Sequence, residues 1–144
     1  MSALDLSGVT LLLIDDSRSV RTVLKTLLCG LGISRIYECR DPDDALVVAR
    51  LSRPDLALVD YDLGLTSGLD LIRRFRDSQV SANPDMPMIL LAPPSLPHFV
   101  RDAEAAGADA VLPKPVNAGT LGQKIGQVLQ SATRGGAVQS RHSA

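Results

Sequence analysis

An apolar run at residues 56–59 ends abruptly in the acidic side chain of Asp60. The run is too short for a helix and too evenly apolar for a half-exposed strand, so it predicts a strand buried on both faces of a sheet. Asp60 then falls at the carboxyl end of that strand, where the loops of an open α/β sheet diverge and leave a crevice for a ligand. An acid at such a place is also a common helix cap or turn former. Its meaning therefore depends on its neighbours.

Two other predicted strands also end in charged side chains. The run at 9–14 stops at Asp15 and Asp16, and the run at 110–112 is followed two residues later by Lys114. If the strands are parallel, three carboxylates and one ammonium meet at one edge of the sheet. Acids this close repel one another unless a cation lies between them. Oxygen ligands without neighbouring His or Cys favour a hard ion, so the sequence predicts a Mg²⁺ site.

Hydrophobic periodicity and turn residues divide the chain into five strands that alternate with five helices. The strands are expected at residues 9–14, 36–39, 56–59, 88–91 and 110–112. The helices are expected after a Ser17 cap, around 45–51, after Gly68, at about 95–106 and after an Asn117 cap. Right-handed crossovers turn this alternation into an α/β fold, a doubly wound parallel sheet with helices on both faces. The expected strand order is 2-1-3-4-5, as in flavodoxin-like proteins.

Length and composition limit the number of domains and the possible classes of function. The 144 residues suffice for one domain, with residues 1–8 as a polar lead, 9–131 as the folded part and 132–144 as a disordered tail. A net charge of −1 gives no basic footprint for direct nucleic-acid binding. Neither a signal peptide nor a membrane span is recognisable, so we expect a cytoplasmic protein. Cys29 and Cys39 lack metal or redox spacing and are expected as reduced thiols.

Four motifs in one order resemble the receiver domain of response regulators. They are Asp15-Asp16 after the first strand, Asp60 after the third, Gly68 at the start of the third helix and Lys114-Pro115 after the fifth strand. The resemblance covers about residues 9–131. It implies a CheY-like, single-domain receiver of a two-component or phosphorelay system, which is not an enzyme and signals by protein–protein contact. The implied partners are a histidine kinase or histidine phosphotransfer protein and a downstream protein, with a homodimer left open.

The resemblance also implies a role for each site residue. Asp60 would be the phosphoacceptor and a ligand of Mg²⁺. Asp16 would bind the metal directly, Asp15 mainly through water, and Asp62 through its backbone carbonyl. Lys114 would pair with Asp60 and then with the phosphoryl oxygens. These roles suit phosphoryl transfer, which needs an in-line nucleophile and neutralised charge on the equatorial oxygens.

Three positions depart from the family pattern. Ala92 stands where a Thr or Ser hydroxyl usually ends the fourth strand, and Val111 stands where the fifth strand usually carries an aromatic ring. Pro93 replaces a residue whose backbone N–H usually binds the phosphoryl group, and proline has no N–H. Each lost donor would cost on the order of 1.5–3 kcal/mol. Asp62 adds a further negative charge beside the phosphoryl site. Because Asp60, the metal-binding acids and Lys114 remain, the acceptor chemistry is expected to be intact, while the usual relay from the phosphoryl group to the output surface is expected to be lost.

Two other functions stay open at this point. A pseudo-receiver would keep the fold and the metal site but signal without phosphate, and Ala92, Pro93 and Val111 favour it. The sequence Asp-Tyr-Asp at 60–62 also fits the D-x-D of phosphohydrolases resembling the haloacid dehalogenase family, with Asp62 as general acid/base. The short chain, without room for a cap domain, weighs against an enzyme of this kind.

The last two helices and the fifth strand form the expected contact face for a partner. His98, Phe99 and Arg101 are predicted to lie near this face. Phe99 is also expected as a core residue of the fourth helix. The sequence names neither the cognate kinase nor the downstream target.

Overall fold

One parallel sheet organises the computed structural model, which describes residues 5–94 and 97–134. Within these residues the strands are β1 (Thr10–Ile14), β2 (Arg35–Cys39), β3 (Leu56–Asp60), β4 (Met88–Ala92) and β5 (Ala110–Pro113). The helices are α1 (Arg18–Gly30), α2 (Pro42–Ser52), α3 (Gly68–Arg76), α4 (Pro97–Ala106) and α5 (Ala118–Arg134). The strand order is β2-β1-β3-β4-β5, and every paired neighbour is parallel. The predicted doubly wound α/β class and strand order are confirmed.

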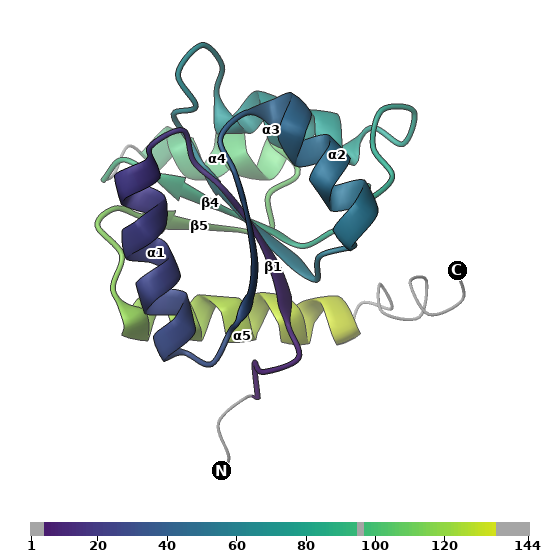
Figure 1. The fold of residues 1–144 in the computed structure, drawn as a ribbon. Coiled ribbons are helices and arrows are strands. Elements are labelled where there is room, and N and C mark those ends of the chain that lie inside the picture. The colour runs from purple at the N-terminus through teal and green to yellow at the C-terminus, as the bar shows by residue number, and fades with distance from the viewer. Residues whose placement is uncertain (1–4, 95–96, 135–144) are drawn as a thin grey trace.

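Alternate residues of the central strands build two apolar layers. Leu12 and Val59 belong to the layer under α2, α3 and α4, whereas Leu58 and Leu91 belong to the layer under α1 and α5. Figure 1 shows the two sets of helices on opposite sides of the sheet. Every residue of β3 and β4 is buried. This burial on both faces explains why these strands read as unbroken apolar runs rather than as alternating ones.

Short-range hydrogen bonds start the helices where the sequence indicates. The hydroxyl of Ser17 accepts from the backbone N–H of Val20, and Oδ1 of Asn117 accepts from that of Thr120. Both predicted caps are therefore confirmed. The second helix begins at Pro42 instead of near residue 45, because Asp41 caps it and proline is well suited to a first helical position.

Both ends of the predicted domain need correction. The last helix extends to Arg134, so residues 132–134, expected in the tail, are helical. Its buried residues Leu121, Ile125 and Val128 anchor it in the apolar layer under α1 and α5. In the predicted lead, Leu6 is only 7% exposed and joins the layer under α1 and α5. The start of the fourth helix at residue 95 and the tail at 135–144 fall outside the described residues.

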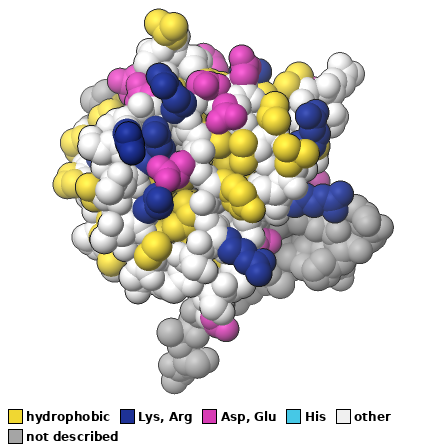
Figure 2. All heavy atoms as spheres, viewed as in Figure 1, with side chains coloured by type: hydrophobic (Ala, Val, Ile, Leu, Met, Phe, Trp, Pro, Cys, Tyr) yellow, Lys and Arg dark blue, Asp and Glu magenta, His cyan; other side chains and the backbone are white. Residues whose placement is uncertain are grey.

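Charged side chains of both signs are mixed on the surface. Figure 2 shows Lys and Arg scattered among acidic groups on one face, without a continuous basic patch there. Exposed pairs such as Arg73–Asp70 and Arg74–Asp43 account for part of this mixing and contribute little to stability. In the described part of the chain, every helix is too short or too polar to cross a membrane.

Candidate metal centre

The carboxyl ends of β1 and β3 bring three acidic side chains together. The two strands are parallel neighbours, with Ile14 beside Val59, so the residues that follow them meet at one edge of the sheet. One ligand oxygen each from Asp15, Asp16 and Asp60 lies within 4.8 Å of the others. Asp15 and Asp60 are 2% and 4% exposed, whereas Asp16 is exposed. The cluster thus has a buried floor and one acid at its open side.

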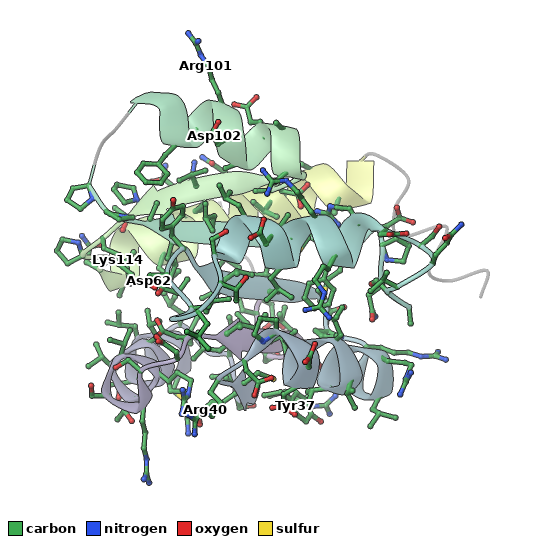
Figure 3. All side chains as sticks on the ribbon, turned by 90° about the horizontal axis from the view of Figure 1, so that it is seen from above. Tyr37, Arg40, Asp62, Arg101, Asp102 and Lys114 are labelled. Atoms are coloured by element: carbon green, nitrogen blue, oxygen red, sulfur yellow. The ribbon has the colours of Figure 1, made fainter. Side chains whose placement is uncertain are left out.

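Lys114 reaches this cluster from the end of β5. Its backbone N–H donates to the carbonyl of Ala92 over 2.8 Å, which fixes the start of its side chain. Its ammonium pairs with Oδ1 of Asp60 and keeps about a third of its side chain exposed to solvent. Figure 3 shows Lys114 and Asp62 at the same end of the molecule. The ammonium therefore offsets part of the cost of burying the Asp60 carboxylate.

Asp15 offers a free ligand oxygen to the cluster. Oδ1 of Asp15 accepts from the backbone N–H of Ser17 over 2.8 Å, but its Oδ2 is buried with no hydrogen-bond partner among the described residues. Burial raises the pKa of Asp15, and the nearby Asp60 adds to this rise while the Ser17 N–H opposes it. Burial also raises the pKa of Asp60 against the hydrogen bond from Lys114. An unsatisfied buried oxygen within an all-oxygen cluster fits a hard cation such as Mg²⁺.

Glycine is required at two points beside the cluster. At Gly68 an added Cβ would lie 2.2 Å from the backbone oxygen of Asp60, and the Gly68 N–H donates to the carbonyl of Tyr61. Gly64 has φ of +83°, and its Cβ would lie 3.2 Å from Oδ2 of Asp16. Gly68 belongs to the motif identified in the sequence, whereas the closeness of Gly64 to Asp16 was not predicted.

The carboxylate of Asp62 turns back into its own loop. Its Oδ1 accepts from the backbone N–H of Gly64 over 3.0 Å, and Asp62 forms a bridge with Ser67 across the loop. The side chain is exposed. Asp62 thus closes a local turn, as Asp often does, in addition to bringing its charge to this end of the molecule.

The positions that depart from the family pattern lie where the sequence indicates. Ala92 ends β4 and is buried, Pro93 is exposed, and Val111 is half-buried on β5. Sequence reasoning missed a different aromatic contact, which involves the residue next to Asp60. The Tyr61 ring meets the Phe99 ring of α4 edge-on, with centroids 4.6 Å apart and planes at 86°.

The remaining candidates on the contact face belong to α4. Phe99 is half-buried, so it combines a core contact with partial exposure. Figure 3 shows Arg101 pointing outwards from α4. The side chain of His98 lies outside the described residues.

An apolar groove of about 330 Å³ adjoins the cluster. Its walls come from α1, with Val20 and Val23, and from the segment after β5, with Pro115 and Val116. Lys114 lines the groove as well, so one residue belongs both to the groove and to the acidic cluster. Val23 is 60% exposed, which leaves the groove accessible from solvent.

We predict that Asp15→Asn stabilises the metal-free protein at neutral pH, with a gain on the order of 1 kcal/mol. The pKa of Asp15 is raised by burial, so the folded state binds the carboxyl proton more tightly than the unfolded chain. Its contribution to stability is therefore largest below the unfolded-state pKa and falls as pH rises through the folded-state pKa. The gain should shrink in acid, where the carboxyl is neutral in both states. Urea unfolding of both proteins in the presence of a chelator measures this difference in the free energy of unfolding.

The exposed Asp85 provides the matched control, since Asp85→Asn should change stability by less than about 0.5 kcal/mol. Mg²⁺ at about 100 times its Kd should add about 2.7 kcal/mol to the unsubstituted protein, and less to Asp15→Asn. A lower free energy of unfolding for Asp15→Asn at neutral pH without metal would contradict this account of the buried carboxylate.

Comparison with known proteins agrees with this geometry. The family model for the response regulator receiver domain matches residues 11–126. The chain is 24% identical to the chemotaxis protein CheY-3 of Vibrio cholerae over 90% of this chain and 98% of that protein. It is 29% identical to the cyclic di-GMP phosphodiesterase response regulator RpfG of Xanthomonas campestris over 93% of this chain, but it spans only 35% of RpfG.

A solved structure gives the same result. The chemotaxis protein CheY4 of Vibrio cholerae superposes with a TM-score of 0.75 at 25% identity, over 83% of this chain and 98% of that one. These matches favour a phosphorelay receiver over a module that signals without phosphate. The chain belongs to the response regulator receiver domain family, the receivers of two-component and phosphorelay signalling.

Proposed function

We propose that this receiver takes a phosphoryl group on Asp60 from a histidine kinase or histidine phosphotransfer protein and signals by contact with a downstream protein. One observation carries the proposal: the buried Asp60 carboxylate pairs with Lys114, and two further acids lie within ligand distance of one cation. The family's general dependence on Mg²⁺ and a histidine donor supports the same assignment. We place this role in the cytoplasm, where such donors act.

Asp60 acts as the nucleophile. A carboxylate oxygen attacks the donor phosphorus in line; an O–P bond forms as the P–N bond to the donor imidazole breaks, and the electron pair stays on the imidazole. Asp15, Asp16, Asp60 and the carbonyl of Asp62 would hold a Mg²⁺ ion, which neutralises charge on the phosphoryl oxygens. Lys114 pairs with Asp60 beforehand and would then stabilise those oxygens with its ammonium.

The product has fewer donors than is usual in the family. Ala92 offers no hydroxyl and Pro93 no N–H, so the phosphoryl group depends on Lys114 and the cation. We therefore expect transfer to proceed but retention to be weak, as in a protein that draws phosphate through a relay. Signalling would use α4, because Tyr61, the neighbour of Asp60 in the chain, contacts Phe99 on that helix.

Asp62 is poorly placed to support phosphatase turnover. The Asp62 carboxylate that a D-x-D phosphohydrolase would use as general acid/base accepts a hydrogen bond within its own turn. The phosphodiesterase activity in the name of RpfG belongs to that protein, of which this chain matches about a third. We propose a signalling module without turnover of its own.

The groove beside Lys114 suits the protein that carries the phosphohistidine. The donor imidazole must approach Asp60 from solvent, and the groove opens on Lys114, the residue that pairs with Asp60. Its apolar walls, including the exposed Val23, match the apolar side of a helix. We therefore propose that a donor helix packs on α1 and the segment after β5.

We predict that acetyl phosphate with Mg²⁺ adds one phosphoryl group to the intact protein, measured by mass spectrometry. Asp60→Asn and removal of metal should each abolish the gain, because the first removes the nucleophile and the second the charge compensation. Beryllofluoride binding distinguishes a phosphorylated product that is hydrolysed too fast to detect from a protein that is not phosphorylated at all. Folded protein that binds neither phosphoryl group nor beryllofluoride would contradict the proposal.

We predict that Val23→Asp slows transfer from a cognate histidine donor at least about tenfold, because it places a charge in an apolar contact. Labelling by acetyl phosphate should be unchanged, since a small donor does not need the groove. Leu51→Asp is the matched control, because Leu51 is 76% exposed on α2, away from the groove. Equal slowing by both substitutions would argue against this docking face.

A further inference from the structure

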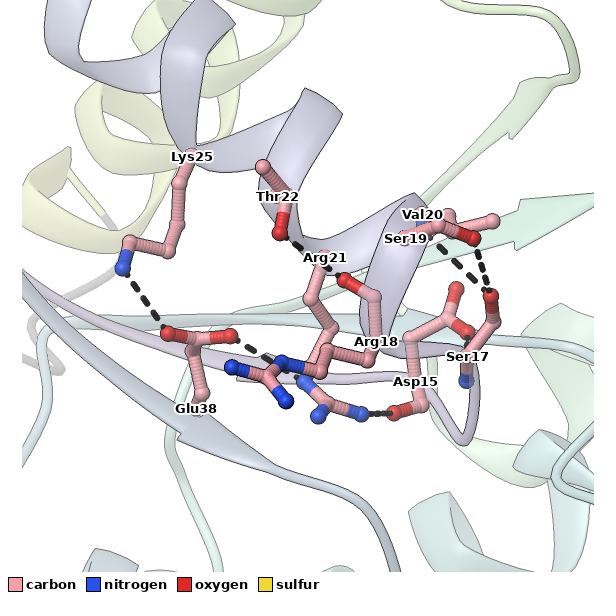
Figure 4. Close-up of polar contacts among 9 residues, drawn as sticks. All are labelled: Asp15, Ser17, Arg18, Ser19, Val20, Arg21, Thr22, Lys25 and Glu38. Carbon is pink, nitrogen blue, oxygen red and sulfur yellow. Dashed lines mark hydrogen bonds and ion pairs between the residues drawn. The ribbon is translucent and has the colours of Figure 1, made fainter.

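We propose that Arg21 is a positioning residue for the cation site. It fixes the peptide between Asp15 and Asp16 and so sets the directions of their carboxylates. The inference rests on the function proposed above. It concerns a side chain on α1 that is not itself a ligand and that the family motifs do not include. Its contacts with Asp15 and Glu38 are drawn in Figure 4.

Arg21 binds the metal loop and the edge strand at once. Its Nη1 donates to the backbone carbonyl of Asp15 over 2.6 Å, and its Nε donates to Oε1 of Glu38 on β2 over 3.1 Å. The Arg21 side chain is only 13% exposed. Low exposure and two directed contacts restrict the guanidinium to one position, which the planar fork of arginine makes possible.

Glu38 holds Arg21 in place. Its second oxygen, Oε2, pairs with the ammonium of Lys25 over 2.9 Å, one turn further along α1. The hydrogen bonds from Lys25 and Arg21 hold the pKa of Glu38 below its ordinary value, so it remains ionised. Glu38 thereby restricts the guanidinium to the position from which it donates to the carbonyl of Asp15.

The Arg21 contact completes the fixation of Asp15. The N–H of Asp15 donates to the carbonyl of Cys39, which follows Glu38 on β2, and its Oδ1 accepts from the N–H of Ser17. Arg21 donates a hydrogen bond to the carbonyl of Asp15. Three groups of Asp15 are thus held, and Oδ2, buried and without a partner among the described residues, is left for the cation.

The same contact reaches Asp16 through the backbone. The carbonyl of Asp15 and the N–H of Asp16 belong to one planar peptide unit, so fixing the first orients the second. Asp16 is the exposed acid of the cluster, with less packing to hold it. Partners that orient metal ligands in this way commonly change metal affinity by about 10- to 100-fold when they are removed.

The charge of Arg21 and its positioning role predict opposite changes in Mg²⁺ affinity when Arg21 is removed. Arg21 is a cation near the acids, so its removal would strengthen Mg²⁺ binding if it acted only through its charge. If Arg21 acts by positioning, its removal weakens binding. Arg21→Met therefore separates the two effects, and Arg21→Lys, which keeps the charge but loses the fork, provides a second test.

The experiment is calorimetric titration of the full chain with Mg²⁺ alone. We expect Kd to rise about 10-fold for Arg21→Met and also to rise for Arg21→Lys and Glu38→Gln. Lys25→Met is the matched control, since Lys25 binds Glu38 but does not contact Asp15, and it should leave Kd nearly unchanged. Urea unfolding in chelator establishes that each variant is folded, and the milder Arg21→Lys and Glu38→Gln serve if Arg21→Met is not.

The results separate this inference from the proposed function. Equal or tighter Mg²⁺ binding by folded Arg21→Met, or an unchanged Kd for both Arg21→Lys and Glu38→Gln, overturns the positioning role alone. Failure of the unsubstituted protein to bind Mg²⁺, or full binding by Asp16→Asn, overturns the proposed metal site and this inference with it. A rise in Kd for the Arg21 variants without one for Lys25→Met supports the role.

Discussion

Burial of two carboxylates at the ends of neighbouring strands is the constraint on which the rest of this site depends. Asp15 and Asp60 are almost completely withdrawn from water, and burial raises the pKa of both. Such charges are tolerated only where fixed partners or a cation offset the loss of hydration. Lys114 offsets part of it at Asp60, and the backbone N–H of Ser17 offsets part of it at Asp15. In the proposed function, a bound metal ion would offset the deficit that remains.

The surrounding fold keeps these groups in position. Both faces of β3 and β4 are packed, which fixes the register of the strands and hence the position of Asp60 at the end of β3. Gly68 lets α3 begin directly against the Asp60 carbonyl, and Gly64 lets the preceding loop pass close to Asp16. A larger side chain at either place would displace the loop that carries Asp62. Packing and chemistry are thus linked through the same few backbone positions.

Local patterns made much of this predictable from the sequence. Evenly apolar runs identified the buried strands, and charged residues at their ends identified Asp15, Asp16, Asp60 and Lys114 as members of one cluster. The early start of α2 and the extension of α5 to Arg134 were missed, because helix ends depend on caps and packing more than on propensity. The contacts from Arg21 to Asp15 and Glu38, and from Tyr61 to Phe99, depend on tertiary geometry. An arginine on a helix or an aromatic ring after a strand carries no local sign of its partner.

The site combines the acidic cluster and Lys114 with neighbouring residues that depart from the family pattern. Ala92 and Pro93 remove two donors, while Lys114 and the acids are present. Val111 is aliphatic, and the nearby aromatic contact comes instead from Tyr61 and Phe99. On this account, binding and transfer depend on the acidic cluster, and the signal leaves through contacts on α4 rather than through a hydroxyl at the end of β4.

A crystal structure of the protein with Mg²⁺ and beryllofluoride tests the central claim most directly. The account predicts beryllofluoride on a carboxylate oxygen of Asp60, with Lys114 against its fluorines. It also predicts Mg²⁺ among Asp15, Asp16, Asp60 and the carbonyl of Asp62. Beryllofluoride absent from Asp60, or Mg²⁺ bound away from these residues in an otherwise intact fold, would contradict it.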